Sequence, residues 1–229
     1  MGKTLNDILE VASSYITSEE SLNIIRKAHE IAVKMHEGQF RKSGDPYVQH
    51  PIEVAYILAN LHTGPNTIAS ALVHDVLEDT NMTKEEMEAL LGKDVVSIVD
   101  GVTKISKLKY MTVDKALAKD HQKILLAMAN DMRVILVKIA DRLHNMRTLE
   151  FHSNPEKQAK IARETLELYA PLAHKLGMYR IKAELEDLSL KFISNDEYVE
   201  IASSIKDKKS EREEDIALMS SKIDELLQK

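Results

Sequence analysis

Apolar residues recur three, four and seven positions apart along almost the whole chain. Between positions 24 and 35 they are Ile24, Ile25, Ala28, Ile31, Ala32 and Met35. This spacing places apolar side chains on one face of an α-helix. The chain also has only 7 Gly, 5 Pro and 4% aromatic residues, and such a composition favours helices over a β-sandwich or barrel. The sequence therefore predicts an all-α fold.

The same periodicity, interrupted by breaker residues, predicts where the helices lie. We expect one helix that ends at Gly38, one that starts at Thr83 and others over Ile52–Leu61, Thr67–Leu77, Val95–Val99, His121–Asn130, Arg133–Thr148, Lys157–Leu176 and Ile181–Phe192. Loops are expected over Gln39–Pro51 and Ser106–Val113. With the ends of the chain included, the pattern predicts roughly ten helices.

The composition changes near position 200, which suggests a division of the chain. We expect one helical domain over residues 1–200 and, over 201–229, a charged linker followed by an amphipathic helix. The apolar stripe of that helix consists of Ile216, Met219, Ile223, Leu226 and Leu227. Such a stripe needs a surface to pack on. It either folds back on this domain or belongs to a domain that follows.

Charge and cysteine content exclude several classes of function. A net charge of −6 argues against a general nucleic-acid binder, which would normally carry a basic surplus. The absence of cysteine excludes a disulfide framework and a thiolate metal site. We find neither a signal peptide nor an apolar run long enough to span a membrane. The sequence therefore predicts a cytoplasmic protein that binds neither nucleic acid nor a membrane.

Four ionisable residues are concentrated in one short stretch, at His74, Asp75, Glu78 and Asp79. On a continuous helix His74 and Asp75 would lie about 100° apart and could approach one point. The carboxylates would repel one another and lose solvation on a mostly buried helix, and a divalent cation would relieve both effects. The alternative is a solvated acidic end of a helix, which is common by chance.

A second stretch carries a polar stripe on an otherwise apolar segment, formed by Lys138, Asp141, Arg142 and Asn145. Their spacing of i, i+3, i+4 and i+7 places them on one face of a helix. Such a stripe is expected to face a cleft. Two alternatives remain: the β-branched run could be a buried strand, and the charges could form a simple buried ion pair.

The loop over Gln39–Pro51 supplies a third candidate region. Arg41 and Lys42 could clamp phosphate groups there, and Arg binds them through two hydrogen bonds. His50 directly precedes Pro51, which favours an extended backbone for His50 at the entrance of a helix. A basic pair in a loop is, alternatively, solvated surface.

His50, His74, Asp75 and Asp141 together supply two imidazoles and two carboxylates. This mixed set suits Mn²⁺, Fe²⁺, Co²⁺ or Zn²⁺ better than Ca²⁺. A metal at such a site activates water and polarises a phosphoryl oxygen. His144, on the same predicted helix as Asp141, would either support Asp141 or simply pack.

The order H…HD…D resembles the HD superfamily of metal-dependent phosphohydrolases. More narrowly, residues 20–200 resemble the N-terminal hydrolase domain of the long RelA/SpoT homologues. The segments that carry this resemblance are Arg41–Gly44, Tyr47, His50–Pro51, His74–Thr80, Asp100–Lys104, Ile139–Leu149, Ala162–Leu166 and Tyr169–Met178.

The resemblance implies an all-α, HD-superfamily domain with helices around a metal-binding cleft. It further implies hydrolysis of ppGpp or pppGpp to GDP or GTP and pyrophosphate, with Mn²⁺ as the metal. The positions that match the family's metal ligands are His50, His74, Asp75 and Asp141. Glu78 and Asp79 match the pair that serves the attacking water and the departing 3′-oxygen.

The resemblance also indicates which residues contact the substrate. The matching positions are Arg41, Lys42, Ser43, Asn145 and Thr148. Lys138 and Arg147 are added here because of the polar stripe and the negative charge of the substrate. The family's long members continue into a synthetase domain, so we expect such a C-terminal domain as a partner in the full-length protein.

Three other functions compete with this hypothesis. Some long RelA/SpoT homologues carry a hydrolase domain that has lost activity and serves regulation, but here the HD pair and the Glu-Asp pair are both intact. A different nucleotide could be the substrate, as elsewhere in the HD superfamily. The acidic cluster could also bind a purely structural metal, in which case the metal would have no open coordination positions.

Overall fold

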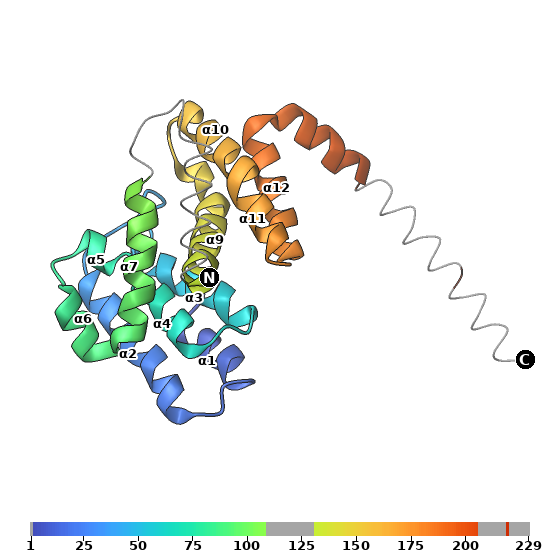
Figure 1. The fold of residues 1–229 in the computed structure, drawn as a ribbon. Helices are drawn as coiled ribbons and strands as arrows, with labels where there is room; N and C mark the ends of the chain where they lie inside the picture. The colour runs from blue at the N-terminus through green and yellow to red at the C-terminus, as the bar shows by residue number, and fades with distance from the viewer. Residues whose placement is uncertain (1, 109–130, 206–218, 220–229) are drawn as a thin grey trace, which may run out of the picture. The chain divides into compact units, whose positions relative to one another are not determined.

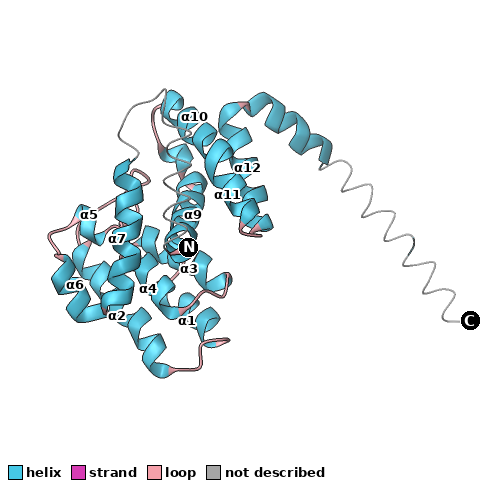
Figure 2. Cartoon of the chain, in the orientation of Figure 1, coloured by secondary structure: helices cyan, strands magenta, loops and turns pink. Residues whose placement is uncertain are grey.

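The computed structural model describes residues 2–108, 131–205 and 219. The chain forms two compact units, Met1–Ser153 and Asn154–Lys229, whose helices are labelled in Figure 1. Within the described residues the β-structure is limited to one isolated bridge between Phe40 and Pro46, and Figure 2 shows helices throughout. The predicted all-α fold is therefore confirmed. No described helix is long and apolar enough to cross a membrane.

The helices of the first unit account for most of its residues. They are α1 (Leu5–Ser13), α2 (Glu19–Met35), α3 (Gln49–Asn60), α4 (Pro65–Leu72), α5 (Val76–Asp79), α6 (Lys84–Leu91), α7 (Lys93–Leu108), α9 (Met132–Arg147) and the short 3₁₀-helix η1 (Leu149–Phe151). The expected start of a helix at Thr83 is confirmed, because Thr83 and Glu86 form a capping box at the beginning of α6.

The second unit contains the remaining described helices. They are α10 (Pro155–Glu164), the π-helical turn η2 (Thr165–Tyr169), α11 (Ala170–Lys175) and α12 (Tyr179–Ile193), followed by a helix over 195–205. The single helix expected over Lys157–Leu176 thus contains a π-helical turn, at which the Thr165 hydroxyl donates to the Ile161 carbonyl. The predicted domain boundary at residue 200 stays a prediction. Apart from the exposed Met219, the C-terminal apolar stripe lies outside the described residues.

Helix α4 lies at the centre of the first unit. It packs against α2, α3, α7 and α9, and every residue from Thr67 to Leu72 is buried. Helix α9 is buried around most of its circumference as well. A largely apolar helix is stable in water only when neighbours cover it in this way. The two helices are therefore fixed by the neighbours that cover them, and they can hold polar side chains in defined positions.

The sequence prediction of one continuous helix over Thr67–Leu77 is wrong. Helix α4 ends at Leu72, and α5 begins only at Val76, so His74 and Asp75 lie in the turn between them. The Nδ1 atom of His74 lies 2.8 Å from the carbonyl oxygen of Ala71. In a continuous helix that carbonyl would accept from the Asp75 N–H. The imidazole replaces the backbone donor, and the helix ends there.

The extended backbone expected at His50 is also wrong. Helix α3 begins at Gln49, three residues earlier than predicted, so His50 lies inside its first turn. Pro51 is the third residue of the helix, where its missing N–H costs no intrahelical hydrogen bond. The steric preference of a residue before proline is therefore overcome by the packing of a buried first turn.

The loop expected over Ser106–Val113 is wrong in its first three residues, because α7 continues to Leu108. The rest of that segment and the helix expected over His121–Asn130 lie outside the described residues. On the other side of this gap, α9 starts at Met132 and ends at Arg147, within one residue of the predicted Arg133–Thr148.

At Gly101, helix α7 passes close to α9. A Cβ atom at position 101 would lie 2.6 Å from one methyl carbon of Val134 and 3.3 Å from the other, and Val134 is buried. Overpacking of a core typically costs about 1–3 kcal/mol, and replacing a helical glycine returns about 0.5–1 kcal/mol. We expect Gly101→Ala to lower the free energy of unfolding by about 1–2 kcal/mol in denaturant titrations.

The double variant Gly101→Ala/Val134→Ala is the control for this prediction. Since Val134→Ala removes both methyl groups that the new Cβ would meet, Gly101→Ala should cost clearly less in that background. Equal costs in the two backgrounds would mean that the close approach at position 101 is not what requires glycine.

Candidate metal centre

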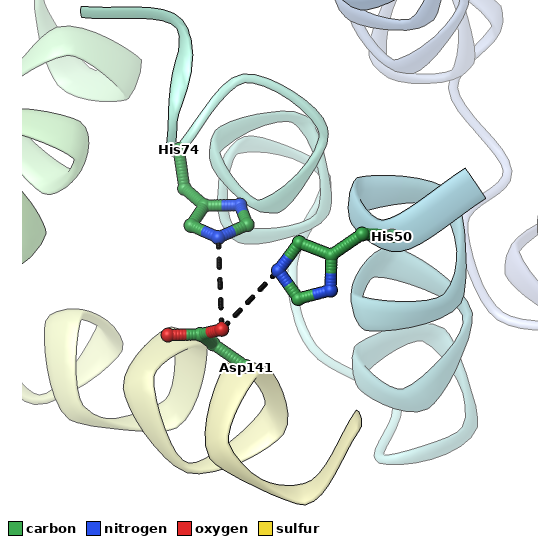
Figure 3. Close-up of side chains that lie close together, drawn as sticks. All are labelled: His50, His74 and Asp141. Atoms are coloured by element: carbon green, nitrogen blue, oxygen red, sulfur yellow. Dashed lines mark ion pairs between the residues drawn. The ribbon is translucent and has the colours of Figure 1, made fainter. Parts of the chain in front are cut away.

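Three buried side chains from separate parts of the first unit meet at one point. His50 comes from α3, His74 from the turn between α4 and α5, and Asp141 from α9. One potential ligand atom from each lies within 4.8 Å of the others, and Figure 3 shows both imidazoles directed at the carboxylate. Their exposed fractions are only 3%, 1% and 7%. Three of the four predicted metal ligands therefore form a compact buried cluster.

The distances describe a set of facing ligand atoms. Asp141 Oδ1 lies 3.2 Å from Nε2 of His50 and 3.9 Å from Nε2 of His74. Asp75, the fourth predicted ligand, is less buried and borders the same point. Its Oδ1 atom lies 3.2 Å from Nε2 of His74, and its Oδ2 atom lies 3.8 Å from Nε2 of His50. All four predicted ligands are thus brought together.

Hydrogen bonds on the far side of each imidazole indicate which nitrogen carries the hydrogen. Nδ1 of His74 faces a carbonyl oxygen, so it must donate. Nδ1 of His50 lies 2.7 Å from Nδ1 of His144, and the latter nitrogen also lies 3.0 Å from Nη1 of Arg41. Since a guanidinium group can only donate, Nδ1 of His144 is the acceptor and His50 donates to it. Both Nε2 atoms therefore present lone pairs to the carboxylates.

This arrangement directs acceptors at acceptors, which is unfavourable unless a cation lies between them. Nε2 of His74 is fully buried and has no hydrogen-bond partner among the described residues. Two imidazole nitrogens and two carboxylates are also a donor set that divalent transition metals prefer. The residues therefore fit a divalent metal ion, which would take its place among these four side chains.

The electrostatics keep the carboxylates charged. Burial by itself would raise the pKa of Asp141, but the Lys138 ammonium group, 2.8 Å away, holds that pKa well below its usual range. Burial would also raise the pKa of Asp75, but any proton carried by His74 or His50 and the hydrogen bond from Tyr47 hold it below its ordinary value.

Burial lowers the pKa of a histidine, whereas it raises the pKa of a carboxyl group. Loss of solvation lowers the pKa of His50. It also lowers the pKa of His144 to about 3, with help from the positive charge of Arg41. Neutral imidazoles beside ionised carboxylates are the protonation states that bind a metal.

Two members of the predicted polar stripe on α9 surround Asp141. Lys138 Nζ donates to Oδ2 of Asp141, and Asn145 Nδ2 donates to its Oδ1 over 2.6 Å. The amide oxygen of Asn145 in turn accepts from Nη2 of Arg41 over 2.8 Å. The fourth member, Arg142, is buried as well. The stripe therefore extends the cluster from the carboxylate to the loop that carries Arg41.

Two of the other predicted substrate residues, Ser43 and Thr148, form hydrogen bonds within their own segments. The Ser43 hydroxyl donates to Asp45 within its own loop, and Lys42 is exposed. Thr148 donates back to the carbonyls of its own helix. Arg147 is exposed, yet its charge contributes to the lowered pKa of His144. Their roles in substrate binding stay predictions.

Glu78 and Asp79 lie on α5, one turn beyond the HD pair, and both are exposed. Partial loss of solvation and the negative charge of Asp75 raise the pKa of Glu78, while Thr103 and Lys138 oppose the shift. The carboxylates are thus at the open side of the cluster, where a substrate and water can reach them.

Sequence reasoning gave no role to Tyr47 and Thr103, and the structure places both at the site. The Tyr47 hydroxyl lies 2.8 Å from Oδ2 of Asp75 and 3.0 Å from Oδ2 of Asp79. Thr103 is buried on α7, and its side chain opposes the rise in the pKa of Glu78. Both residues lie in segments that carry the family resemblance, and Tyr47 also stands three residues before His50, so the sequence held signals that could have drawn attention to them. Nδ1 of His144 is hydrogen-bonded to His50 and Arg41. The alternative that His144 supports Asp141 is therefore replaced by support of His50.

Comparisons with known proteins place this site in a family. The HD domain family matches the chain over residues 28–179. A GTP pyrophosphokinase of Myxococcus xanthus is 48% identical over 198 residues, which are 85% of this chain and 26% of that protein. The bifunctional (p)ppGpp synthase/hydrolase SpoT of Escherichia coli K12 is 43% identical over 226 residues, which are 99% of this chain and 32% of that protein.

The chain thus spans only about a quarter to a third of the length of these curated relatives. A solved structure is similar over a much larger share of its own length. It is described as a metazoan ortholog of SpoT that hydrolyzes ppGpp and plays a role in starvation responses, and its sequence is 26% identical. The match covers 72% of this chain and 93% of that chain, with a TM-score of 0.50.

The sequence match and the buried cluster point to the same assignment. The match over residues 28–179 covers more than half of the chain and contains His50, His74, Asp75 and Asp141. This chain therefore belongs to the HD domain family.

Proposed function

We propose that this chain is a Mn²⁺-dependent hydrolase that removes the 3′-diphosphate of ppGpp or pppGpp as pyrophosphate and leaves GDP or GTP. The buried cluster of His50, His74 and Asp141 is the observation that carries this proposal. The choice between hydrolysis and synthesis is supported by the coverage of the relatives. The chain matches 93% of a protein described as hydrolysing ppGpp but only 32% of a bifunctional one.

The two histidines and the two aspartates would hold the Mn²⁺ ion, which when bound would polarise the phosphoryl group and favour activation of water. Water attacks the phosphorus atom that is bonded to the 3′-oxygen. A bond forms between the water oxygen and this phosphorus atom, and the bond between the phosphorus atom and the 3′-oxygen breaks. One proton leaves the water and one reaches the departing 3′-oxygen. Glu78 and Asp79 are the groups that accept and return these protons.

Arg41 is suited to hold the phosphate groups of the substrate. Its contacts with His144 and Asn145 use one N–H each, and a guanidinium group has five. Among the described residues the other N–H groups have no acceptor, so they can bind phosphate oxygens. Because the two existing contacts fix the guanidinium against His144 and Asn145, little ordering is needed when the substrate arrives.

The test is release of pyrophosphate from purified ppGpp by the chain, after removal of metal with EDTA and again after addition of Mn²⁺. We expect no release from the metal-free protein and full release once Mn²⁺ is present. GTP, which lacks a 3′-diphosphate, is the control substrate and should release none. If saturating Mn²⁺ binds yet ppGpp stays intact, the chain is a regulatory HD module, and this proposal is wrong.

A further inference from the structure

Tyr47 is held rigidly at the edge of the metal centre. Its ring stacks on the ring of His36, with centroids 4.7 Å apart, and its edge meets His50. His36 is itself buried and bonded to the side chain of Gln39. The backbone N–H of Tyr47 donates to the Gln39 carbonyl over 2.9 Å. The direction of the Tyr47 hydroxyl is therefore fixed by its surroundings.

That hydroxyl lies between two carboxylates. It is 2.8 Å from Oδ2 of Asp75 and 3.0 Å from Oδ2 of Asp79. A phenol has one hydrogen and can donate to only one of them at a time. A phenol is protonated at neutral pH, so the hydroxyl acts as a donor toward the two carboxylates. The single hydrogen is shared between a predicted metal ligand and a predicted proton-transfer group.

Asp79 needs such a partner. It is the last residue of α5, a helix of only four residues, and it is exposed. Among the described residues, the Tyr47 hydroxyl provides the hydrogen bond that holds its carboxylate. A short exposed side chain at the end of a single helical turn would otherwise sample several rotamers.

We infer that Tyr47 is a positioning residue that fixes the Asp79 carboxylate beside the metal centre through its hydroxyl hydrogen. This inference rests on the proposed function. When a cation neutralises Asp75, that carboxylate competes less for the hydrogen, and the hydroxyl serves Asp79.

The test is Tyr47→Phe, which keeps the stacked ring and removes only the hydroxyl. We expect kcat for pyrophosphate release to fall about 30-fold, since misplacement of a catalytic group by about 1 Å can cost a factor on the order of 100. KM for ppGpp and the Mn²⁺ dissociation constant, the latter measured by calorimetry on the metal-free protein, should each stay within about threefold. These two values separate positioning from loss of substrate or metal binding.

Tyr15→Phe is the matched control. Its hydroxyl is also hydrogen-bonded, to the carbonyls of Ala59 and Thr63, but it has no contact with the cluster. We expect its thermal midpoint to fall slightly and its kcat to match that of the wild type.

A double-mutant cycle identifies the group through which Tyr47 acts. In an Asp79→Asn background, Tyr47→Phe should change kcat less than threefold, because the carboxylate that it positions is gone. In a Glu78→Gln background the full effect of about 30-fold should remain.

Three kinetic outcomes would overturn the inference: unchanged kcat in Tyr47→Phe, an equal effect in both backgrounds, or a loss that excess Mn²⁺ restores. Failure of the proposed function looks different, because the wild-type protein in the same experiment would then release no pyrophosphate. In that case the Mn²⁺ dissociation constant still reports whether the hydroxyl affects the metal centre. A change of more than tenfold in Tyr47→Phe would contradict the inference on binding data alone.

Discussion

Asp141→Asn is expected to abolish metal-dependent activity and leave a folded protein. Asp141 is the carboxylate that both imidazoles face, and it carries a full negative charge because its pKa is held well below the usual range. Asparagine keeps the shape and loses the charge. Since first-row divalent metals depend on anionic ligands at mixed sites, we expect Mn²⁺ affinity to fall by at least about 100-fold and pyrophosphate release by on the order of 1,000-fold.

Thermal unfolding with and without Mn²⁺ tests this prediction independently of activity. A ligand that binds only the folded state at 100 times its dissociation constant stabilises that state by about 2.7 kcal/mol. The wild type should show a shift of that size, and Asp141→Asn should show almost none. The depressed pKa of Asp141 contributes stability that is present at neutral pH and is lost as pH falls through the folded-state pKa. The metal-free variant should therefore also be somewhat less stable than the wild type at pH 7.

Asp187→Asn is the matched control for the change in charge. Asp187 is exposed on α12, so its replacement should alter neither Mn²⁺ affinity nor activity. If Asp141→Asn retained both the Mn²⁺-dependent stabilisation and the activity of the wild type, the cluster would not be the metal centre.

The helices could be predicted from the sequence because their cause is local and repeated. Apolar spacing located α9 to within one residue at each end, and the pattern at Thr83 located the start of α6. In both cases many residues indicate the same period, or a side chain caps the adjacent backbone. A single residue that departs from the pattern therefore has little effect on the predicted bounds of a helix.

The break at the HD pair could not be predicted in the same way. Apolar periodicity continues through it, since Val73 and Val76 are both buried. The helix ends because a single imidazole bonds to the carbonyl of Ala71, and periodicity contains no information about such a bond. His74 and Asp75 do approach one point, as the sequence predicts, but the turn between α4 and α5 brings them there and not a continuous helix.

The residues of the candidate site could be predicted from the sequence, but the hydrogen bonds that connect them could not. Chemistry and family resemblance together indicate His50, His74, Asp75 and Asp141, and the structure brings their ligand atoms together. The hydrogen bond from His50 to His144 links two residues that lie 94 positions apart. Pairing at such separations is set by the packing of α3 on α9, which the local sequence does not encode.

Glu78→Gln should separate catalysis from stability at the same site. General acid–base groups typically contribute factors of about 100 to 10,000, so we expect kcat to fall by at least about 100-fold with Mn²⁺ affinity unchanged. The pKa of Glu78 is raised by partial loss of solvation and by Asp75. The acid limb of the wild-type pH–rate profile should therefore lie above the ordinary range of a glutamate, and at saturating Mn²⁺ the variant should lack it.

The sign of the effect on stability follows from the same shift. A glutamate whose folded-state pKa exceeds its unfolded value takes up a proton on folding, so its ionised form opposes folding above that pKa. Glutamine carries no charge, and Glu78→Gln should be as stable as the wild type at pH 7 or slightly more stable. Such a combination, in which activity is lost and stability is kept, is typical of a residue retained for chemistry.

Glu85→Gln, an exposed change in the first turn of α6, provides the comparison. It should leave the pH–rate profile intact and slightly weaken the helix, because a negative charge near the start of a helix is favourable. If Glu78→Gln and Glu85→Gln had equal activity, Glu78 would have no part in proton transfer. If Glu78→Gln instead lost stability at pH 7, its carboxylate would support the fold, and the raised pKa would need another cause.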